Sequence, residues 1–258
     1  MFRGFQNTGK SIITFSPSNM FSGFAATQFS ENTLPIVTTG IEAWWTSQSG
    51  ITLSGSNVTS WVDLIGGYNL QPTTSQPTYN AANPLYRAYP TLGFTSSQNL
   101  LAGNILNIGT NAGLTIVAVV NLTGSSATFL SKSSNASDQT AGTWSLQYYT
   151  GSIYFTYGKG VGYAQVLTNF TPPATAVITG IIDRTNGLIW CYVNYVSVSG
   201  TTPATLTNVT PVFPLGINAV SGSSGVATVM EIIMYNQALS QTQVNQNVAY
   251  LKSKYGIS

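Results

Sequence analysis

The stretch that decides the fold is Thr228-Val-Met-Glu-Ile-Ile-Met-Tyr-Asn-Gln-Ala-Leu-Ser240, followed by a segment ending Tyr250-Leu-Lys-Ser-Lys-Tyr-Gly-Ile257. Residues 228–235 are dense in β-branched and aromatic side chains, which is typical of a strand. A helical pattern begins at Ser240. One strand, a tight turn and one amphipathic helix are therefore predicted to close a chain that is otherwise poor in helical pattern.

Both ends of this helix carry recognisable signals. Ser240 and Gln243 have the spacing of a capping box, in which each side chain bonds the backbone N–H of the other residue. Gly256 suits the left-handed residue that follows a helix. The predicted buried stripe consists of Val244, Val248, Leu251 and Tyr255. The cations in the last turn, where the macrodipole favours them, are Lys252 and Lys254.

Charge is scarce along the whole chain. Only 5% of the 258 residues are charged, against roughly 25% in an ordinary soluble domain, while 43% are hydrophobic. A sizeable core is therefore available beneath a neutral surface rich in hydroxyl and amide groups. No Lys/Arg cluster exists, so we expect no nucleic-acid partner. A surface with little charge also lacks colloidal repulsion, which favours association with other copies or partners.

Two residue types that often carry chemistry are missing or rare. The chain has no histidine, which removes the commonest general base and metal ligand. Its one cysteine, Cys191, lies in an apolar run and is expected to be a small buried side chain. The N-terminus has no continuous apolar core of a secretory signal peptide, and no run of 18 apolar residues predicts membrane insertion.

Residues 1–39 differ from the rest and are predicted to form an extended N-terminal arm. Its six phenylalanines fit neither helical nor strand periodicity. They are Phe2, Phe5, Phe15, Phe21, Phe24 and Phe29. The functional interpretation is an assembly arm that docks onto a neighbouring subunit or partner, since six phenylalanines would not be left in water. The alternatives are an arm wrapped on its own domain or a disordered end.

Residues 40–258 predict a β-sandwich or jelly roll, because short strands separated by turn residues recur throughout. Expected strands are 41–46, 51–53, 58–62, 91–94, 114–122, 127–131, 143–149, 152–157, 163–168, 176–183, 188–198, 212–217 and 226–235. Asn186-Gly187 predicts a hairpin turn, since these residues tolerate positive φ. Residues 68–90 hold four prolines and little periodicity, so they predict a long ordered loop.

Four segments within residues 41–257 resemble the concanavalin A-like, laminin-G-type jelly-roll domains found in phage and environmental sequences. They are Trp61-Val-Asp-Leu-Ile-Gly-Gly-Tyr-Asn-Leu-Gln71, Gln76-Pro-Thr-Tyr79 with Tyr89-Pro-Thr-Leu-Gly-Phe-Thr-Ser-Ser-Gln-Asn-Leu100, the hairpin Ile182–Asn194, and the closing strand and helix. The resemblance implies a concanavalin A-like β-sandwich. It is poorly specific for function, because this fold hosts lectins, glycanases, adhesion modules and virion proteins.

The acidic residues argue against catalysis. Glycoside hydrolysis needs two carboxylates flanking one bond, yet no two of the six acids lie closer than 11 positions in sequence. We therefore predict no catalytic residue and no enzyme. Glu231 is expected to face solvent or to pair with a Lys or Arg.

No cofactor is predicted, apart from a possible weak calcium ion. Its candidate ligands are Asp63 with Asn69, or Asp138 with Asn135. The alternative for Asp63 is a brace that satisfies backbone N–H groups of its own loop. The sequence also departs from the family pattern at two places: Thr95-Ser96 stands where Asp-Gly is usual, and Tyr195 stands where Gly is usual. The carboxylates that the family uses for calcium are therefore mostly missing.

A glycan can be bound without a metal by aromatic side chains with hydroxyl and amide neighbours. The candidates are Trp144, Tyr148, Tyr149, Tyr154, Tyr157 and Tyr163. Tyr148 and Tyr149 must point to opposite faces of an extended strand, so at least one is a core residue. Trp44, Trp45 and Trp61 are expected to be core or loop anchors.

These observations predict a non-enzymatic structural protein of a virion, in capsid decoration or as a tail or head fibre-adhesin component. Its partners would be other virion proteins and copies of itself. The alternative is a lectin-like module that recognises glycan on a host cell surface.

Overall fold

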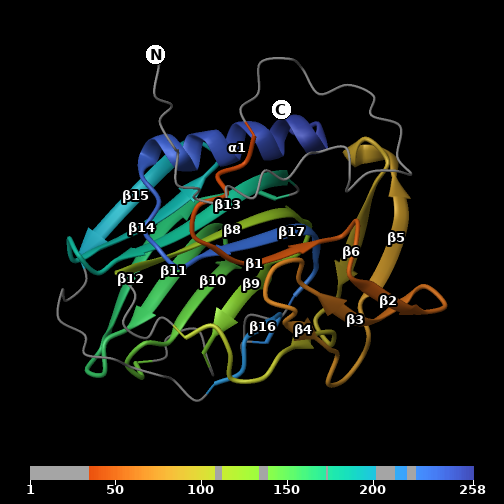
Figure 1. Ribbon diagram of the computed structural model, residues 1–258, viewed down its shortest axis with the longest axis horizontal. Helices are drawn as coiled ribbons and strands as arrows, with labels where there is room; N and C mark the ends of the chain where they lie inside the picture. The colour runs from red at the N-terminus through yellow and green to blue at the C-terminus, as the bar shows by residue number, and fades with distance from the viewer. Residues whose placement is uncertain (1–34, 108–111, 134–138, 173, 202–212, 220–224) are drawn as a thin grey trace, which may run out of the picture. The chain divides into compact units, whose positions relative to one another are not determined.

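The computed structural model describes residues 35–107, 112–133, 139–172, 174–201, 213–219 and 225–258. These residues form two antiparallel β-sheets packed face to face, and helix α1 (Gln241–Tyr255) lies along the outer face of the larger sheet (Figure 1). The predicted all-β sandwich with a short C-terminal helix is confirmed. No helix in the described ranges has the length and apolar character needed to cross a membrane.

The closing strand occupies the middle of the larger sheet. Across that sheet the strands are β15 (Val196–Thr201), β14 (Leu188–Val193), β13 (Ala174–Asp183), β8 (Gly113–Leu122), β17 (Ala227–Tyr235), β6 (Tyr89–Phe94), β5 (Thr78–Asn83), β3 (Asn57–Val62) and β2 (Ile51–Ser54). Strand β1 (Ile41–Thr46) also pairs with β17, and β4 (Asn69–Leu70) pairs with β3. The smaller sheet runs β12 (Tyr163–Asn169), β11 (Ser152–Gly158), β10 (Trp144–Tyr149), β9 (Ser126–Lys132), β16 (Gly216–Ile217) and β7 (Leu100–Leu101).

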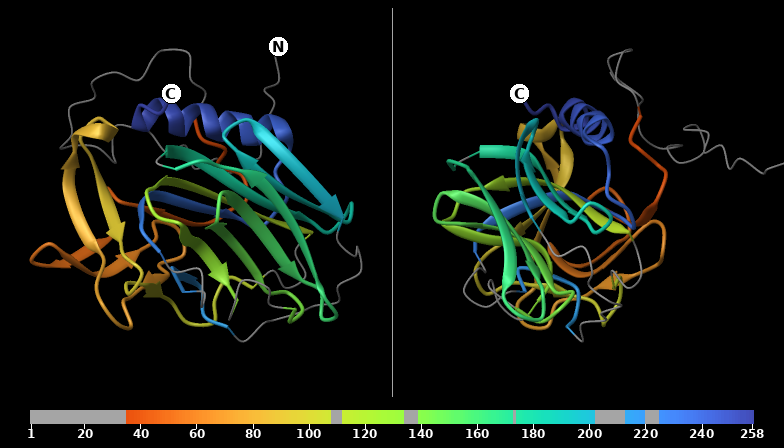
Figure 2. Two further views of the ribbon diagram at one scale, coloured as in Figure 1. Left: turned by 180° about the vertical axis from the view of Figure 1, so that it is seen from behind. Right: turned by 90° about the vertical axis from the view of Figure 1, so that its left-hand side faces the viewer.

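Strand β8 shows why the central strands are apolar at almost every position. Ile116 and Ala118 belong to the core between the two sheets. Val117 and Val119 belong to a second core, between the larger sheet and α1. Because successive strand side chains point to opposite faces, a strand covered on both faces must be apolar on both. The molecule therefore has three layers, which Figure 2 shows from the side.

Helix α1 has the ends and the face that its sequence predicts. Ser240 N–H donates to Gln243 Oε1 at 2.9 Å, and Gln243 N–H donates to Ser240 Oγ at 3.4 Å. Gly256 follows the helix with φ +68°. The four residues of the predicted stripe are fully buried: Val244, Val248, Leu251 and Tyr255.

The prediction of a long loop over residues 68–90 is wrong. The segment contains β4, β5 and a short 3₁₀ helix, Pro84–Tyr86. Strand β5 exposes most of its side chains, so neither face of it needs an apolar pattern. It is held by backbone pairing with β6, in which Tyr79 lies opposite Leu92. The partner strand is the next one along the chain, but a strand without an apolar face gives no signal in the local sequence.

The single strand predicted over residues 188–198 is also wrong, because the chain reverses there. Val193 pairs with Val196, and Asn194 between them has φ +53°. Asn tolerates this left-handed conformation, and the apolar pattern on either side of the turn concealed it. The strand predicted at 212–217 shrinks to β16, and residue 212 lies outside the described residues.

The last residues of the predicted arm take part in the second core. Ile36 and Val37 are 6% and 7% exposed and belong to the cluster beneath α1. Val37 N–H donates to Asn247 Oδ1 at 2.9 Å, and Tyr235 O–H donates to the Val37 carbonyl at 3.0 Å. The six arm phenylalanines lie outside the described residues.

Candidate functional site

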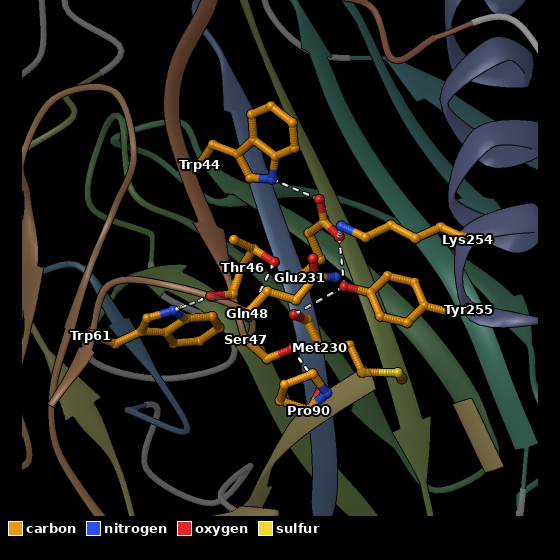
Figure 3. Close-up of polar contacts among 10 residues, drawn as sticks. All are labelled: Trp44, Thr46, Ser47, Gln48, Trp61, Pro90, Met230, Glu231, Lys254 and Tyr255. Atoms are coloured by element: carbon orange, nitrogen blue, oxygen red, sulfur yellow. Dashed lines mark hydrogen bonds and ion pairs between the residues drawn. The ribbon is translucent and has the colours of Figure 1, made fainter. Parts of the chain in front are cut away.

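A carboxylate is buried beneath the C-terminal turn of α1. Glu231, on β17, has no exposed surface, and donors surround it (Figure 3). Trp44 Nε1–H donates to one of its oxygens at 2.6 Å. Lys254 Nζ and Tyr255 O–H donate to the other, each at 2.7 Å. Since Lys254 is only 6% exposed, the pair is a buried ion pair.

This cluster joins elements rather than presenting groups to a ligand. It connects β1, β17 and α1, and both carboxylate oxygens of Glu231 are engaged. Burial, and then the negative charge of Glu231, raise the pKa of Tyr255 well above its usual value, so the phenol stays protonated and donates. Of the two roles predicted for Glu231, the structure shows the paired one.

Asp63 braces its own loop. Its Oδ1 accepts N–H bonds from Ile65 at 2.7 Å and Gly66 at 2.8 Å, and its Oδ2 accepts the N–H of Tyr68. The Asn69 side-chain oxygen accepts the Ser60 hydroxyl at 2.6 Å. The oxygens of Asp63 and Asn69, the predicted calcium ligands, thus already serve protein donors. The other predicted pair, Asp138 and Asn135, lies outside the described residues. Within the described residues, no three His, Cys, Asp or Glu side chains gather to hold a metal ion.

A buried cation that sequence reasoning missed is Lys132, at the end of β9. It has no exposed surface, and its Nζ donates to Asn104 Oδ1 at 2.6 Å, the Ile105 carbonyl at 2.8 Å and the Phe213 carbonyl at 2.9 Å. Burial lowers its pKa to about 8. The Lys132 ammonium therefore links the end of β9 to residues 104–105 and to Phe213, and all three acceptors are uncharged oxygens. A single lysine among serines gives no sequence signal for this role.

Asn218 is a second missed residue, which fastens three segments at one edge of the sandwich. Its Nδ2 donates to the carbonyls of Thr95, Gln98 and Gly225, and its Oδ1 accepts the Gly225 N–H at 2.9 Å. Two of these partners lie more than 100 residues away in sequence, so no local motif announces them.

The six aromatic candidates divide between the two faces of the smaller sheet. Three lie in the core and are at most 3% exposed, so they present no surface to a glycan: Trp144, Tyr148 and Tyr157. Three lie on the outer face: Tyr149, Tyr154 and Tyr163. Tyr149 and Tyr163 are 46% and 39% exposed, and Tyr154 is half-buried. The predicted division of Tyr148 and Tyr149 between opposite faces is confirmed.

The exposed tyrosines form one strip with their neighbours on β12. We call Tyr149, Tyr154, Tyr163, Gln165, Leu167 and Asn169 the tyrosine strip. Tyr154 lies opposite Leu167, and Gln165 donates to the Thr156 hydroxyl at 3.0 Å. Tyr163 lies opposite Gly158, four residues along β11 from Tyr154, which corresponds to about 13 Å. The strip thus has the length to contact several sugar rings in a row.

The remaining aromatic and thiol predictions concern the core. Trp45 and Trp61 are fully buried, and Trp61 Nε1–H donates to the Thr46 carbonyl at 3.0 Å. Trp44 is half-buried over Glu231. Cys191 is fully buried, which confirms it as a small buried side chain and raises the pKa of its thiol to about 12.

Comparison with known proteins finds the same fold in toxin binding domains. No protein-family model and no curated protein matches the sequence. Among solved structures, the binding domain of Paraclostridial Mosquitocidal Protein 1 is similar with a TM-score of 0.60 at 12% identity, covering 81% of this chain and 52% of that one.

Two botulinum neurotoxin structures are similar in the same way. The binding domain of neurotoxin DC, in complex with SialylT, matches 83% of this chain with a TM-score of 0.56 at 12% identity. A type C neurotoxin, described as entering cells through interaction with two ganglioside molecules, matches 76% with a TM-score of 0.53 at 15% identity. The chain spans about half the length of each. These likenesses establish the β-sandwich fold.

Proposed function

We propose that this protein is a non-catalytic binding module that recognises a glycan through the tyrosine strip. The observation that carries the proposal is the outer face of β10, β11 and β12, where the exposed Tyr149 and Tyr163 and the half-buried Tyr154 lie with the amide side chains of Gln165 and Asn169. Tyrosine supplies a flat apolar surface and a polar tip, a combination suited to sugar rings and their hydroxyls. A flat strip on a sheet also suits an extended oligosaccharide.

Two further observations support a binding role. The similar solved structures are binding domains, and two of them are described with sialylated or ganglioside ligands. Three of the four described side-chain carboxylates already serve protein donors: Glu231 is in an ion pair, Asp63 is in a loop brace, and Asp183 accepts from Asn186. The proposal therefore assigns no catalytic residue.

The test is a glycan array with the full chain, followed by titration calorimetry on the glycans that bind. Tyr154→Ala and Tyr163→Ala should each weaken binding roughly tenfold, the change that about 1.4 kcal/mol of lost contact produces. Tyr195→Ala is the matched control, because Tyr195 is also exposed, at 49%, but lies on the β14–β15 turn. Binding that is absent, or unchanged in both strip variants, contradicts the proposal.

The virion role stays a separate proposal, supported by the sparse charge and by the family resemblance of the sequence. The two roles are compatible, since a glycan-binding module can be displayed on a particle. Deleting residues 1–34 tests this role. Loss of incorporation into the particle with glycan binding intact is the expected result, and retained incorporation would exclude the assembly arm.

A further inference from the structure

A second candidate site lies at the opposite face of the molecule, beside the C-terminal end of α1. A cavity of about 410 Å³ opens there between the 3₁₀ turn, the start of β13 and the end of the chain. Its lining consists of Leu85, Tyr86, Ala174, Thr175, Gly256, Ile257 and Ser258. This volume is at the lower end of the range for ligand pockets, so it suits a single sugar ring.

The turn that forms one wall is held in a costly conformation. Arg87 and Ala88 are consecutive non-glycine residues with φ +53° and +60°. Each such residue costs roughly 1–2 kcal/mol relative to an ordinary backbone conformation. The turn holds Leu85 outward, 76% exposed, at the mouth of the cavity. Backbone strain that maintains an exposed apolar side chain beside a cavity is a reason to look for a ligand.

The polar wall has one hydroxyl proton to spare. Tyr86 O–H and Thr175 Oγ1 lie 3.3 Å apart, and Thr175 Oγ1 also accepts Asn121 Nδ2–H at 2.8 Å. Only one of the two hydroxyl protons can lie between the two oxygens. The other therefore has no acceptor among the described residues, whichever group donates. The cavity wall thus offers a hydrogen-bond donor.

A second donor lies at the rim. The Arg87 side chain lies over Gly256, with its Nε about 3.1 Å from where a Cβ at Gly256 would be. Arg87 is exposed and makes no hydrogen bond or ion pair with any described residue. The site therefore combines two donors with an apolar wall formed by Leu85, Ala174 and Ile257.

We propose that this cavity binds a sugar that carries an acetamido group, independently of the tyrosine strip. The acetamido carbonyl would accept from Arg87 or from the spare hydroxyl, and its methyl group would pack against Leu85 and Ile257. A plain hexose offers hydroxyls but no methyl group for the apolar wall. The acetamido group is thus the feature that this lining distinguishes.

The test uses the full chain and a pair of probes, N-acetylglucosamine and glucose, titrated while NMR chemical shifts are followed. We expect saturable shifts with N-acetylglucosamine and at least about fivefold weaker binding of glucose. Leu85→Ala, a surface change with little risk to folding, should weaken N-acetylglucosamine binding roughly fivefold. Thr175→Val, which keeps the shape and removes the hydroxyl, should weaken it by a similar factor.

Two control variants separate this site from the tyrosine strip and from general surface effects. Leu53→Ala removes another exposed leucine, 41% exposed on β2, and should change nothing. Tyr154→Ala should leave cavity binding intact, so failure of the strip and failure of the cavity are distinguishable. Equal binding of glucose, no binding of either sugar, or unchanged binding in both Leu85→Ala and Thr175→Val would overturn the proposal. So would preferential binding of glucuronic acid, which carries a carboxylate but no acetamido group and would identify an anion site.

Discussion

At the scale of single residues, the charges that matter most are the buried ones. Glu231 and Lys254 are 23 positions apart in sequence, and packing of α1 on β17 brings Lys254 Nζ within 2.7 Å of Glu231 Oε2. Removing water from two charges is expensive, and the attraction between them offsets that cost only while both are present. The loss of one partner is therefore expected to cost more than the intact pair contributes.

Lys254→Met should therefore destabilise the protein strongly. It leaves the Glu231 carboxylate buried without its cation, and we expect a loss of about 3 kcal/mol in the free energy of unfolding. Urea denaturation measures this loss. Lys252→Met is the control on the same turn and should cost no more than about 0.5 kcal/mol. Equal losses in the two variants would show that the pair does not hold the helix.

Lys132 predicts a rise in stability at alkaline pH. Burial lowers its pKa to about 8, whereas an unfolded lysine titrates near about 10.4. Between these values the unfolded chain holds a proton that the folded chain has released, so stability increases with pH. Urea midpoints between pH 7.5 and 10 should show this rise, and Lys132→Met should lack it.

The upper limit of this pH window is set by the tyrosines. Burial raises the pKa of Tyr250 to about 12, so tyrosine ionisation in the unfolded chain begins to lower stability as the pH approaches about 10. A wild-type profile that is flat or falling below pH 10, or an identical rise in Lys132→Met, would contradict the assignment.

At the scale of elements, the sequence predicts the helix and the hairpin that are stabilised by interactions between near neighbours. The capping box and apolar stripe predict α1, and the Asn186-Gly187 turn predicts the β13–β14 hairpin. Strand β5 and the break between β14 and β15 escape prediction. The first lacks an apolar face and is held by backbone pairing with β6, and the second is a two-residue turn without glycine.

The strained turn before β6 gives a prediction at this scale. Ala88→Gly removes the steric cost of positive φ, partly offset by the greater freedom of glycine in the unfolded chain. We expect a gain of about 0.5 kcal/mol in stability, measured by urea denaturation. Ala82→Gly, on β5 in the same segment, should instead lose about 0.5–1 kcal/mol. A loss in Ala88→Gly would show that the turn is not strained.

At the scale of the whole molecule, three layers share one central sheet. The smaller sheet covers one face of β8 and β17, and α1 with residues 36–37 covers the other. The tyrosine strip and the cavity beside α1 belong to the two outer layers. The central strands are therefore covered on both faces, and both proposed binding sites lie on the outer layers.

The position of Ile36 and Val37 predicts where the chain can be shortened. Removing residues 1–34 should leave the free energy of unfolding almost unchanged. Removing residues 1–39 exposes the second core and should cost about 3 kcal/mol or more, since burial of each such side chain contributes roughly 1.5–3 kcal/mol. Thermal unfolding of both truncated chains measures the difference. Equal stability of the two truncated chains would show that the folded domain begins at residue 40.

Periodicity, caps and turn residues act over a few neighbours, so the pattern along the chain predicts the sandwich, the closing helix and most of the strands. The sequence also limits the chemistry, through the absence of histidine and the scattered acids. Which tyrosines are core and which are exposed depends on packing between distant segments, because the two faces of a strand differ only once another layer covers one of them. The partners of Glu231 and Lys132, and the cavity beside Gly256, also depend on such packing, since contacts between distant segments leave no pattern along the chain.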